Sequence, residues 1–379
     1  MQMVLEVQEI KIMLRTDKIY YSYNDVKIKP SVTTDTEHRI EGNPYIEGNK
    51  LPIFASPMST VVNEENFTLF EENGITPILP RNIKFETRLK YALEGKWVAF
   101  SLREFEENFC NDTKEYKDST EIKVLIDVAN GHMQKIFDLV AIAKAIYGKQ
   151  LVIMMGNIAN PETYKMCVAN DVDYVRCGIG SGSGCITTSN VGIHMPMASL
   201  IDEIAKIKMS LVSADDDEDV TFTKIIADGG IRNYDDVNKA LALGADYVMI
   251  GGLFASCLES AAPLTRFGGY ESDMDGNWDK ISFIEGKTFF GDKQILPLFK
   301  TFYGMASKDG QKAISGTATK TAEGIKKPIE VKYNLKQWVD NMTDYLRSAM
   351  SYTNSKTLDD LKKAEVILVS NNTYNSVNK

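Results

Sequence analysis

The stretch KIIADGGIRNYDDVNKALALGADYVMIGG, residues 224–252, decides how this chain folds. Short apolar runs open and close it, KIIAD at 224 and DYVMI at 246, with the length and composition of buried strands. Between them, a helical pattern extends from Asp235 through Leu243 and stops at Gly244. A strand, a helix and a second strand in this order are typical of a parallel sheet.

Six similar runs precede this stretch and predict further buried strands. They are LPIFA at 51, ITPIL at 75, KWVAF at 96, IKVLID at 122, LVIMM at 151 and DYVRC at 173. Most are continuously apolar, as strands are when both faces of a parallel sheet are covered. Helical patterns lie between them, for example over residues 134–147 with Gly148 as the stop, and after an N-cap at Asn160 followed by Pro161. Eight strand–helix units predict an α/β fold, the (β/α)8 or TIM barrel, with its chemistry in the loops that follow the strands.

Composition and charge limit the kinds of protein that this chain can be. Its formal net charge of −9 argues against a nucleic-acid partner, because binding a phosphate backbone needs a basic face. No apolar run approaches the roughly 18 residues of a membrane span, and the N-terminus is too polar for a secretion signal. The five cysteines are odd in number and include no C-x-x-C pair, so neither a disulfide framework nor a zinc cluster is indicated. We therefore expect a cytoplasmic protein without a membrane or nucleic-acid partner.

The loop after the sixth strand, CGIGSGSGCITT from Cys177 to Thr188, is rich in glycine. Its glycines allow backbone N–H groups to converge on an anion, or carbonyl groups to point at a cation. Cys185 lies near the end of this run, which makes it a candidate nucleophile if its environment favours the thiolate. Two ordinary interpretations stay open: a glycine-rich barrel loop, and a cysteine that packs as a small apolar side chain.

The loops after the seventh and eighth strands are the place where many barrels bind a phosphate group. Asp228, Gly229 and Gly230 follow one strand, and Gly251 and Gly252 follow the other. Backbone donors of both loops can aim at one anion, although paired glycines also make plain tight turns. The aspartate at the tip of the seventh strand is placed to accept hydrogen bonds from sugar hydroxyls, or to cap the following turn. Asp127 ends the fourth strand in the same way and could contact a second ligand.

Several motifs, in the correct order, resemble the inosine-monophosphate dehydrogenase and guanosine-monophosphate reductase family. They are YNDVKIKPS near residue 23, ASPMSTV at 55, MMGNI at 154, the loop ending in Cys185-Ile186-Thr187, the run from Ile226 to Ala255, and FYGMAS from Phe302 to Ser307. The resemblance implies a single (β/α)8 barrel domain over residues 1–379, with a catalytic loop at about 178–196 and an insertion and flap region at about 256–335. It also implies a purine ribonucleotide as the small-molecule substrate, and a homotetramer.

The same resemblance implies roles for individual residues. The thiolate of Cys185 would attack C2 of the purine, with Thr187 and Glu323 as the relay that protonates a departing amine. The substrate would be held by Ser183, Asp228, Gly229, Gly230, Gly251, Gly252, Gly304, Met305, Ala306 and Gly324. A nicotinamide cofactor would be held by Asp127, Val128, Ala129, Asn157, Gly178, Arg81 and Lys320. The carbonyl groups of Gly180, Gly182 and Cys185 match positions that bind potassium in the family, so K⁺ is a candidate ion.

Two absences favour the reductase branch of the family. The segment from Ser101 to Ile122 is too short for the regulatory adenylate-binding (CBS) modules that the dehydrogenases typically carry. The flap, KDGQKAISGTATKTA at 308–322, lacks the Arg-Tyr pair with which dehydrogenases activate water. DVANG after the fourth strand, Tyr303-Gly304-Met305 and Glu323-Gly324 also resemble the reductase. The expected reaction is therefore the NADPH-dependent reductive deamination of GMP to IMP and ammonia.

Some positions depart from the family pattern and leave other functions open. Gly184 replaces an aliphatic residue before the cysteine, which could loosen the loop, while Arg81 replaces a lysine and Lys320 an arginine. Residues 268–296 look longer than the corresponding family segment. The alternatives are an IMP dehydrogenase that makes XMP with NAD, a reductase of a modified purine nucleotide, a nucleotide-binding homologue without turnover, and a flavin-dependent barrel.

Overall fold

The protein folds around a closed parallel barrel, seen in a computed structural model that describes residues 18–111, 116, 119, 121–214, 222–265, 280–284, 287–318 and 320–369. The barrel strands are β2 (Ile53–Ala55), β3 (Thr76–Pro77), β4 (Val98–Phe100), β5 (Ile122–Asp127), β6 (Leu151–Ile158), β7 (Tyr174–Cys177), β8 (Lys224–Asp228) and β9 (Tyr247–Ile250). Their order is β3-β2-β9-β8-β7-β6-β5-β4. Leu79, just after β3, closes the ring: its N–H donates to the carbonyl of Trp97 at 3.0 Å, and its carbonyl accepts from Ala99 at 2.9 Å. The predicted (β/α)8 barrel is confirmed.

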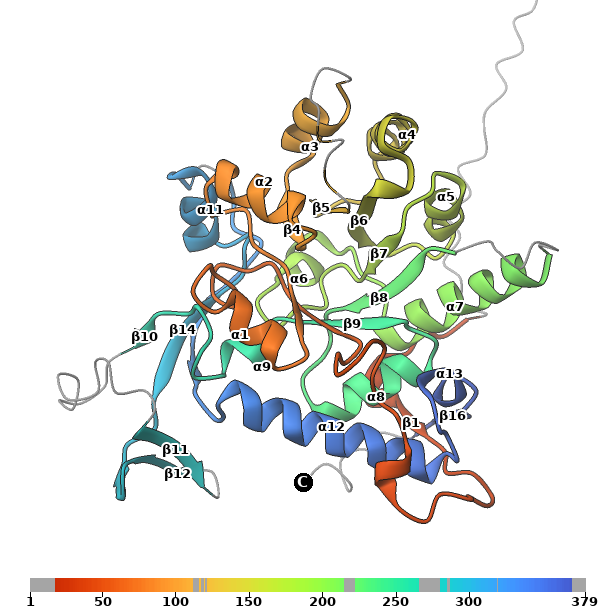
Figure 1. The fold of residues 1–379 in the computed structure, drawn as a ribbon, viewed down its shortest axis with the longest axis vertical. Coiled ribbons are helices and arrows are strands. Elements are labelled where there is room, and N and C mark those ends of the chain that lie inside the picture. Colours follow the sequence, from red (N-terminus) through yellow and green to blue (C-terminus); the bar gives the residue numbers. More distant parts are fainter. Residues whose placement is uncertain are drawn as a thin grey trace, which may run out of the picture.

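A helix follows each barrel strand and packs outside it (Figure 1). In chain order these helices are α1 (Phe67–Glu72), α2 (Phe85–Leu93), α3 (Leu102–Phe109), α4 (Gln134–Tyr147), α5 (Thr163–Ala169), α7 (Met197–Ala214), α8 (Tyr234–Ala242) and α12 (Leu335–Tyr352). Shorter helices are α6 (Thr187–Val191), α9 (Gly252–Ala255), α11 (Lys308–Ser315) and α13 (Leu358–Leu361). Because α12 completes the ring, the whole segment between β9 and α12 is inserted into the last strand–helix unit.

Each predicted strand overlaps an observed one, and the predicted helix at 134–147 has the bounds of α4. Gly148 ends α4 with φ 55°, a left-handed backbone that favours glycine. The prediction for the next helix was wrong by two residues, because α5 begins at Thr163 rather than at Pro161. The Asn160 side chain accepts a hydrogen bond from the backbone N–H of Glu162 at 3.1 Å, so it caps a turn that precedes the helix.

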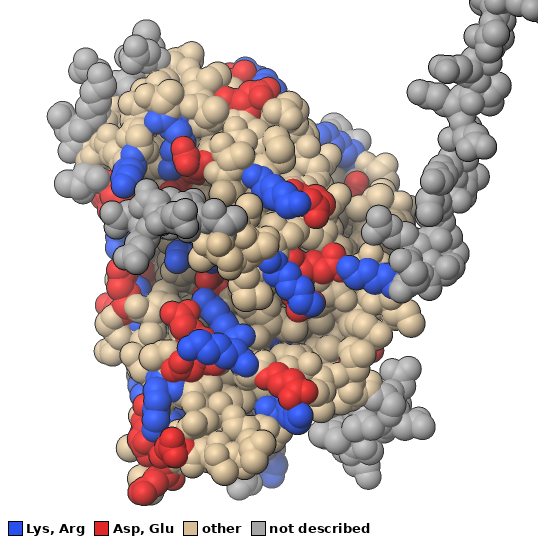
Figure 2. Space-filling model, turned by 90° about the vertical axis from the view of Figure 1, so that its right-hand side faces the viewer, with Lys and Arg blue, Asp and Glu red and all other residues tan. Residues whose placement is uncertain are grey.

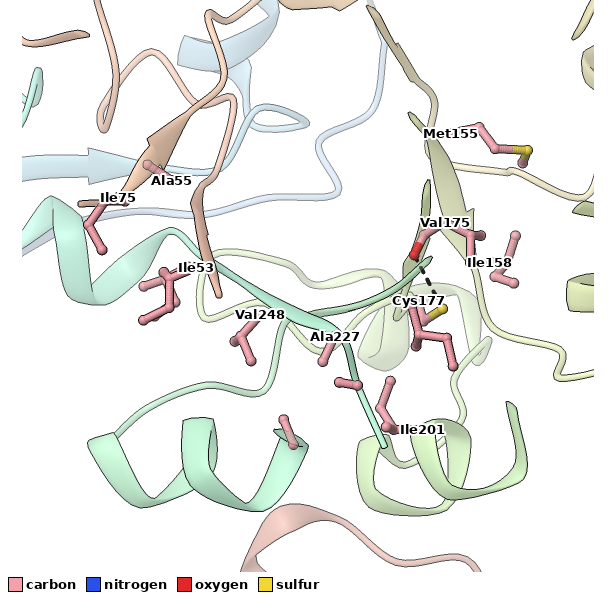
Figure 3. Close-up of a cluster of buried hydrophobic side chains, with 14 of the residues drawn as sticks. Ile53, Ala55, Ile75, Met155, Ile158, Val175, Cys177, Ile201, Ala227 and Val248 are labelled. Carbon is pink, nitrogen blue, oxygen red and sulfur yellow. Dashed lines mark hydrogen bonds between the residues drawn. The ribbon is translucent and has the colours of Figure 1, made fainter. Parts of the chain in front are cut away.

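The core has two layers, one inside the barrel and one between its strands and the helices. The inner layer consists of Phe54, Ile78, Trp97, Ala99, Leu125, Met154, Ile226 and Met249. Figure 3 shows part of the outer layer, where Ile53, Val175 and Val248 from the strands gather with Ile201 from α7. Alternate residues of each strand thus face the two layers, which is why the runs in the sequence are apolar throughout.

The segment between β9 and α12 forms two small antiparallel sheets. One contains β10 (Leu264–Thr265), β14 (Phe299–Tyr303) and β15 (Lys326–Glu330), in the order β10-β14-β15. The other contains β11 (Ile281–Ile284), β12 (Lys287–Phe290) and β13 (Lys293–Ile295), with β11 and β12 at the lower left of Figure 1. This second sheet accounts for the described part of the long segment 268–296, whose residues 268–279 and 285–286 lie outside the described residues. Separately, β1 (Val26–Ile28) pairs with β16 (Val366–Leu368).

The surface carries acidic and basic side chains side by side. Figure 2 shows them interspersed on the side of the molecule where α7 lies in Figure 1. On α7 itself, Lys206 and Asp202 form an ion pair at 2.5 Å. The acidic run at 214–219 falls outside the described residues except for Ala214. Over the described ranges, the helices are each too short or too polar to cross a membrane.

Candidate active site

A cavity of about 260 Å³ opens at the carboxyl ends of the barrel strands. The end of β6 and the loops that follow β2, β5, β7, β8 and β9 contribute to it, as expected for a barrel enzyme. The predicted site residues that line it are Asp127, Ala129, Asn157, Gly178, Gly180, Gly182, Ser183, Cys185, Thr187, Asp228, Gly229, Gly230, Gly251, Gly252, Gly304, Met305, Ala306, Glu323 and Gly324. Residues separated by nearly 200 positions therefore meet in one site.

Three residues predicted to contact the cofactor do not line this cavity. Val128 is held in the loop after β5, where its N–H donates to the carbonyl of Gly156 at 3.0 Å. Arg81 donates from Nη1 to the carbonyl of Asp127 at 3.2 Å. Lys320 is exposed beyond α11. Their roles toward a cofactor stay predictions.

Cys185, Thr187 and Glu323 form a continuous chain of side chains in the cavity wall. The thiol of Cys185 donates to Oγ1 of Thr187 at 3.2 Å, and that hydroxyl donates to Oε2 of Glu323 at 2.9 Å. A carboxyl group linked through a hydroxyl can deliver a proton to a group bound beside the sulfur. The arrangement therefore suits a nucleophile coupled to a proton relay.

Backbone hydrogen bonds hold the cysteine loop against the segment around residue 324. The N–H of Ile325 donates to the carbonyl of Gly184 at 2.9 Å, and the N–H of Ile186 donates to the carbonyl of Glu323 at 2.9 Å. Cys185 itself forms an antiparallel bridge with Gly324. These contacts fix the position of the carboxylate relative to the thiol, although the two residues are far apart in sequence.

Of the five cysteines, all within the described residues, Cys185 is the one that lines the cavity. Cys177 lies in the core, with its Sγ 3.6 Å from the carbonyl oxygen of Val175 (Figure 3), and burial raises its pKa well above the ordinary value. Burial also raises the pKa of Cys167 to about 12 and that of Cys110 to about 11. These thiols are poor nucleophiles, because the reactive form is the thiolate.

The absence of a side chain at Gly184 is explained by Phe302. A Cβ at position 184 would lie 2.9 Å from Cε1 of Phe302 and 3.3 Å from the backbone nitrogen of Gly304. Phe302 is buried and lines the cavity, so its ring occupies the space next to Gly184. The glycine therefore does not leave a gap behind the loop.

We expect the Gly184→Val variant to be destabilised by about 1–3 kcal/mol, the usual cost of overpacking a closed space. Its turnover should fall as well, because the new side chain pushes the neighbouring Cys185 away from Thr187. Urea unfolding and kcat measure the two effects. Combining it with Phe302→Leu should restore part of the stability. Equal stability of Gly184→Val and the unmodified protein would contradict this packing account.

Arg176 is a central residue of the site that the sequence analysis missed. Its side chain is 8% exposed, and it donates from Nη1 to Oδ1 of Asp127 at 2.7 Å and from Nε to Oδ2 of Asp228 at 3.0 Å. Burial opposes its charge, but the carboxylates of Asp228 and Asp127 outweigh burial and raise the pKa of Arg176. An arginine inside the otherwise apolar run YVRC, residues 174–177, was the signal that could have found it.

Asp228 is held through only one of its two carboxylate oxygens. Asn157 donates from Nδ2 to Oδ2 of Asp228 at 2.7 Å, and the guanidinium of Arg176 contacts the same oxygen. Among the described residues no donor is recorded on Oδ1. This oxygen is consequently the acceptor that Asp228 can offer to a ligand in the cavity.

The loops after β7, β8 and β9 form a small cradle with the properties of an anion site. Gly229 and Gly230 have φ of 100° and 74°, and a Cβ on Gly252 would lie 2.7 Å from Oγ of Ser183. The hydroxyl of Ser181 is buried, and no described residue bonds it. Converging glycine backbone and serine hydroxyls fit the oxygen atoms of a phosphate group.

Two of the three carbonyl groups predicted to bind potassium, those of Gly180 and Gly182, accept hydrogen bonds inside the loop. The carbonyl of Gly180 accepts from Oγ1 of Thr188 at 3.0 Å, and that of Gly182 accepts from the N–H of Cys185 at 2.9 Å. Within the described part of the chain, no group of three or more His, Cys, Asp or Glu side chains could hold a metal ion. Each of these carbonyl oxygens keeps a second lone pair, so potassium at this loop stays a prediction.

A family model and individual relatives place this chain in the same protein family. The IMP dehydrogenase / GMP reductase domain matches residues 20–274. A GMP reductase of Streptococcus agalactiae is 28% identical over 363 residues, which are 94% of this chain and 97% of that protein. A GMP reductase of Caenorhabditis elegans is 28% identical over 92% of this chain and 89% of its own. An inosine-5′-monophosphate dehydrogenase of Chlorobaculum parvum is 33% identical over 63% of this chain, a match that spans 43% of that protein.

Proposed function

The chain belongs to the IMP dehydrogenase and GMP reductase family, and we propose that it is an NADPH-dependent GMP reductase. The observation that carries this proposal is the hydrogen-bonded series Cys185–Thr187–Glu323 at the cavity. It supplies both a nucleophile and a route for a proton to a leaving amine. The relatives named GMP reductase, which match nearly the whole chain, support the same choice.

In the proposed reaction the thiolate of Cys185 attacks C2 of the guanine ring. The new bond joins Sγ to C2, and the bond between C2 and the exocyclic amine breaks. Glu323, acting through the hydroxyl of Thr187, supplies the proton with which the amine leaves as ammonia. C2 then receives a hydride from NADPH, and the bond to sulfur breaks with its electron pair returning to Cys185. In sum, GMP, NADPH and two protons give IMP, NADP⁺ and ammonium.

The remaining residues hold the reactants. Oδ1 of Asp228 accepts a hydrogen bond from the ribose, which favours a ribonucleotide, and the cradle at Gly230 and Gly252 takes the 5′-phosphate. Asp127 and Asn157, at the carboxyl ends of β5 and β6, are assigned to the nicotinamide. Potassium at Gly180, Gly182 and Cys185 stays a prediction from the resemblance. A homotetramer in the cytoplasm, with residues 1–379 as one catalytic domain, completes the proposal.

The test is absorbance at the band of reduced nicotinamide, with GMP and NADPH supplied and ammonia quantified. We expect GMP-dependent loss of NADPH with one ammonia released for each NADPH consumed. Untouched NADPH would refute the reductase assignment on GMP. IMP with NAD would be tested next, since one relative is named as an inosine-5′-monophosphate dehydrogenase. Appearance of NADH would then assign the protein to that activity.

Replacing Glu323 with Gln should lower kcat for GMP by roughly 10²–10³-fold, a range typical of losing a general acid. The amide keeps the shape of the side chain but cannot supply a carboxyl proton to Thr187. Steady-state kinetics with ammonia detection measures the loss. Glu330→Gln, on β15 and away from this cavity, is the matched control and should keep the normal rate. Equal rates for both variants would remove Glu323 from the relay.

A further inference from the structure

We propose that Lys327 is a phosphate-binding residue, a cation at the 5′-phosphate of the nucleotide. This inference rests on the proposed function in one respect, that the ligand is a nucleotide. It does not depend on which redox reaction follows. Neither the sequence analysis nor the resemblance to the family assigns any role to Lys327.

The position of Lys327 follows from the pairing of β15 with β14. Lys327 is directly opposite Phe302 in this pair, and its Nζ lies 5.9 Å from the centre of the Phe302 ring. The same ammonium donates to the carbonyl oxygen of Ser183 at 3.4 Å. Lys327 is not itself among the residues that line the cavity, but the two residues that its ammonium contacts, Ser183 and Phe302, both are. Its ammonium therefore lies beside Ser183, one of the residues of the glycine and serine cradle.

The charged side chains that line the cavity include no cation left over for a phosphate dianion. Three carboxylates line it, from Asp127, Asp228 and Glu323, against one guanidinium, from Arg176. That guanidinium is already bound to two of the carboxylates. A further positive charge near the glycine cradle would offset the repulsion between these groups and the ligand.

Lys327 differs from Lys326, its neighbour on β15, in the partners of its ammonium group. Lys326 forms an ion pair with Asp309 at 3.1 Å, whereas no ion pair with a carboxylate is recorded for Lys327 among the described residues. Within the described part of the chain its ammonium contacts a carbonyl and an aromatic face, so it has donors left for an anion. Lysine is suited to this task, because its compact charge on a flexible stem can follow a phosphate oxygen.

The experiment is to measure the Kd of GMP and of guanosine by calorimetry, without NADPH, for the unmodified protein, Lys327→Gln and Lys326→Gln. We expect Lys327→Gln to weaken GMP binding about tenfold, equivalent to about 1.4 kcal/mol. Guanosine, which lacks the phosphate, should bind equally to both variants. Lys326→Gln should bind GMP normally, and Lys327→Arg should recover most of the affinity. The GMP affinity of Lys327→Gln should also depend less on salt concentration.

Two results would overturn the assignment. One is a GMP affinity in Lys327→Gln that equals that of Lys326→Gln. The other is an equal loss for GMP and guanosine, which indicates a change in the fold of the site rather than a lost phosphate contact. Thermal unfolding of each variant identifies such a change, because a variant with an altered site should unfold at a lower temperature than the unmodified protein. If the reductase proposal is wrong, the unmodified protein will not consume NADPH. The comparison of GMP and guanosine affinities would still test the role of Lys327, because it is made without NADPH.

Discussion

Replacing Cys185 with Ala should lower kcat with GMP and NADPH by at least about 1000-fold, since loss of a nucleophile removes the covalent route altogether. GMP affinity should change little, because the cradle and Asp228 stay in place. Steady-state kinetics and calorimetry measure the two quantities. Mass spectrometry of the unmodified protein quenched during turnover should show a nucleotide adduct on Cys185.

The matched control for this variant is Cys110→Ala. Cys110 is also half-buried, but it lies at the end of α3 and donates to the carbonyl of Leu139, away from the cavity. Its replacement should leave turnover near normal. A Cys185→Ala enzyme with more than about a tenth of the normal kcat would exclude the covalent mechanism, whatever else binds in the cavity.

Replacing Arg176 with Met should destabilise the protein by about 3 kcal/mol, at the lower end of the range for breaking a buried ion pair. The carboxylates of Asp127 and Asp228 would then face each other without their shared cation. They retain 22% and 14% side-chain exposure, so solvent would relieve part of the cost. GMP affinity should fall too, since Asp228 would lose one of its two supports. Urea unfolding and calorimetry provide the measurements.

Arg103→Met is the control for the stability measurement. Arg103 pairs with Glu107 at 2.7 Å on the surface of α3, with 85% side-chain exposure, and such pairs contribute little. We expect this variant to be within about 0.5 kcal/mol of the unmodified protein. The stability of Arg176→Lys should lie between those of Arg176→Met and Arg103→Met. Lysine keeps the positive charge, but it lacks the planar guanidinium that bonds both carboxylates. Equal stability of Arg176→Met and Arg103→Met would show that the network contributes nothing.

The sequence by itself determined the barrel and most of the site. Continuous apolar runs such as KIIAD and DYVMI predict strands covered on both faces, and a closed ring of eight parallel strands is the arrangement that covers them. Carboxyl ends of parallel strands point the same way, so Cys185, Asp228 and Gly251 had to lie near one another. The glycines after the sixth, seventh and eighth strands carried the rest of that prediction.

The tertiary structure alone decided which side chains touch. The family resemblance predicts that Thr187 and Glu323 act together. The 2.9 Å hydrogen bond between them depends on backbone contacts of the segment around Gly324 with the cysteine loop. Arg176 between two aspartates, Phe302 in the space beside Gly184, and Lys327 at Ser183 could not be read from the chain. The spacing of apolar residues along the chain predicts which face of a strand or helix a residue lies on, because that spacing reflects local backbone geometry. The contacts named here depend instead on how closely separate strands, helices and loops pack.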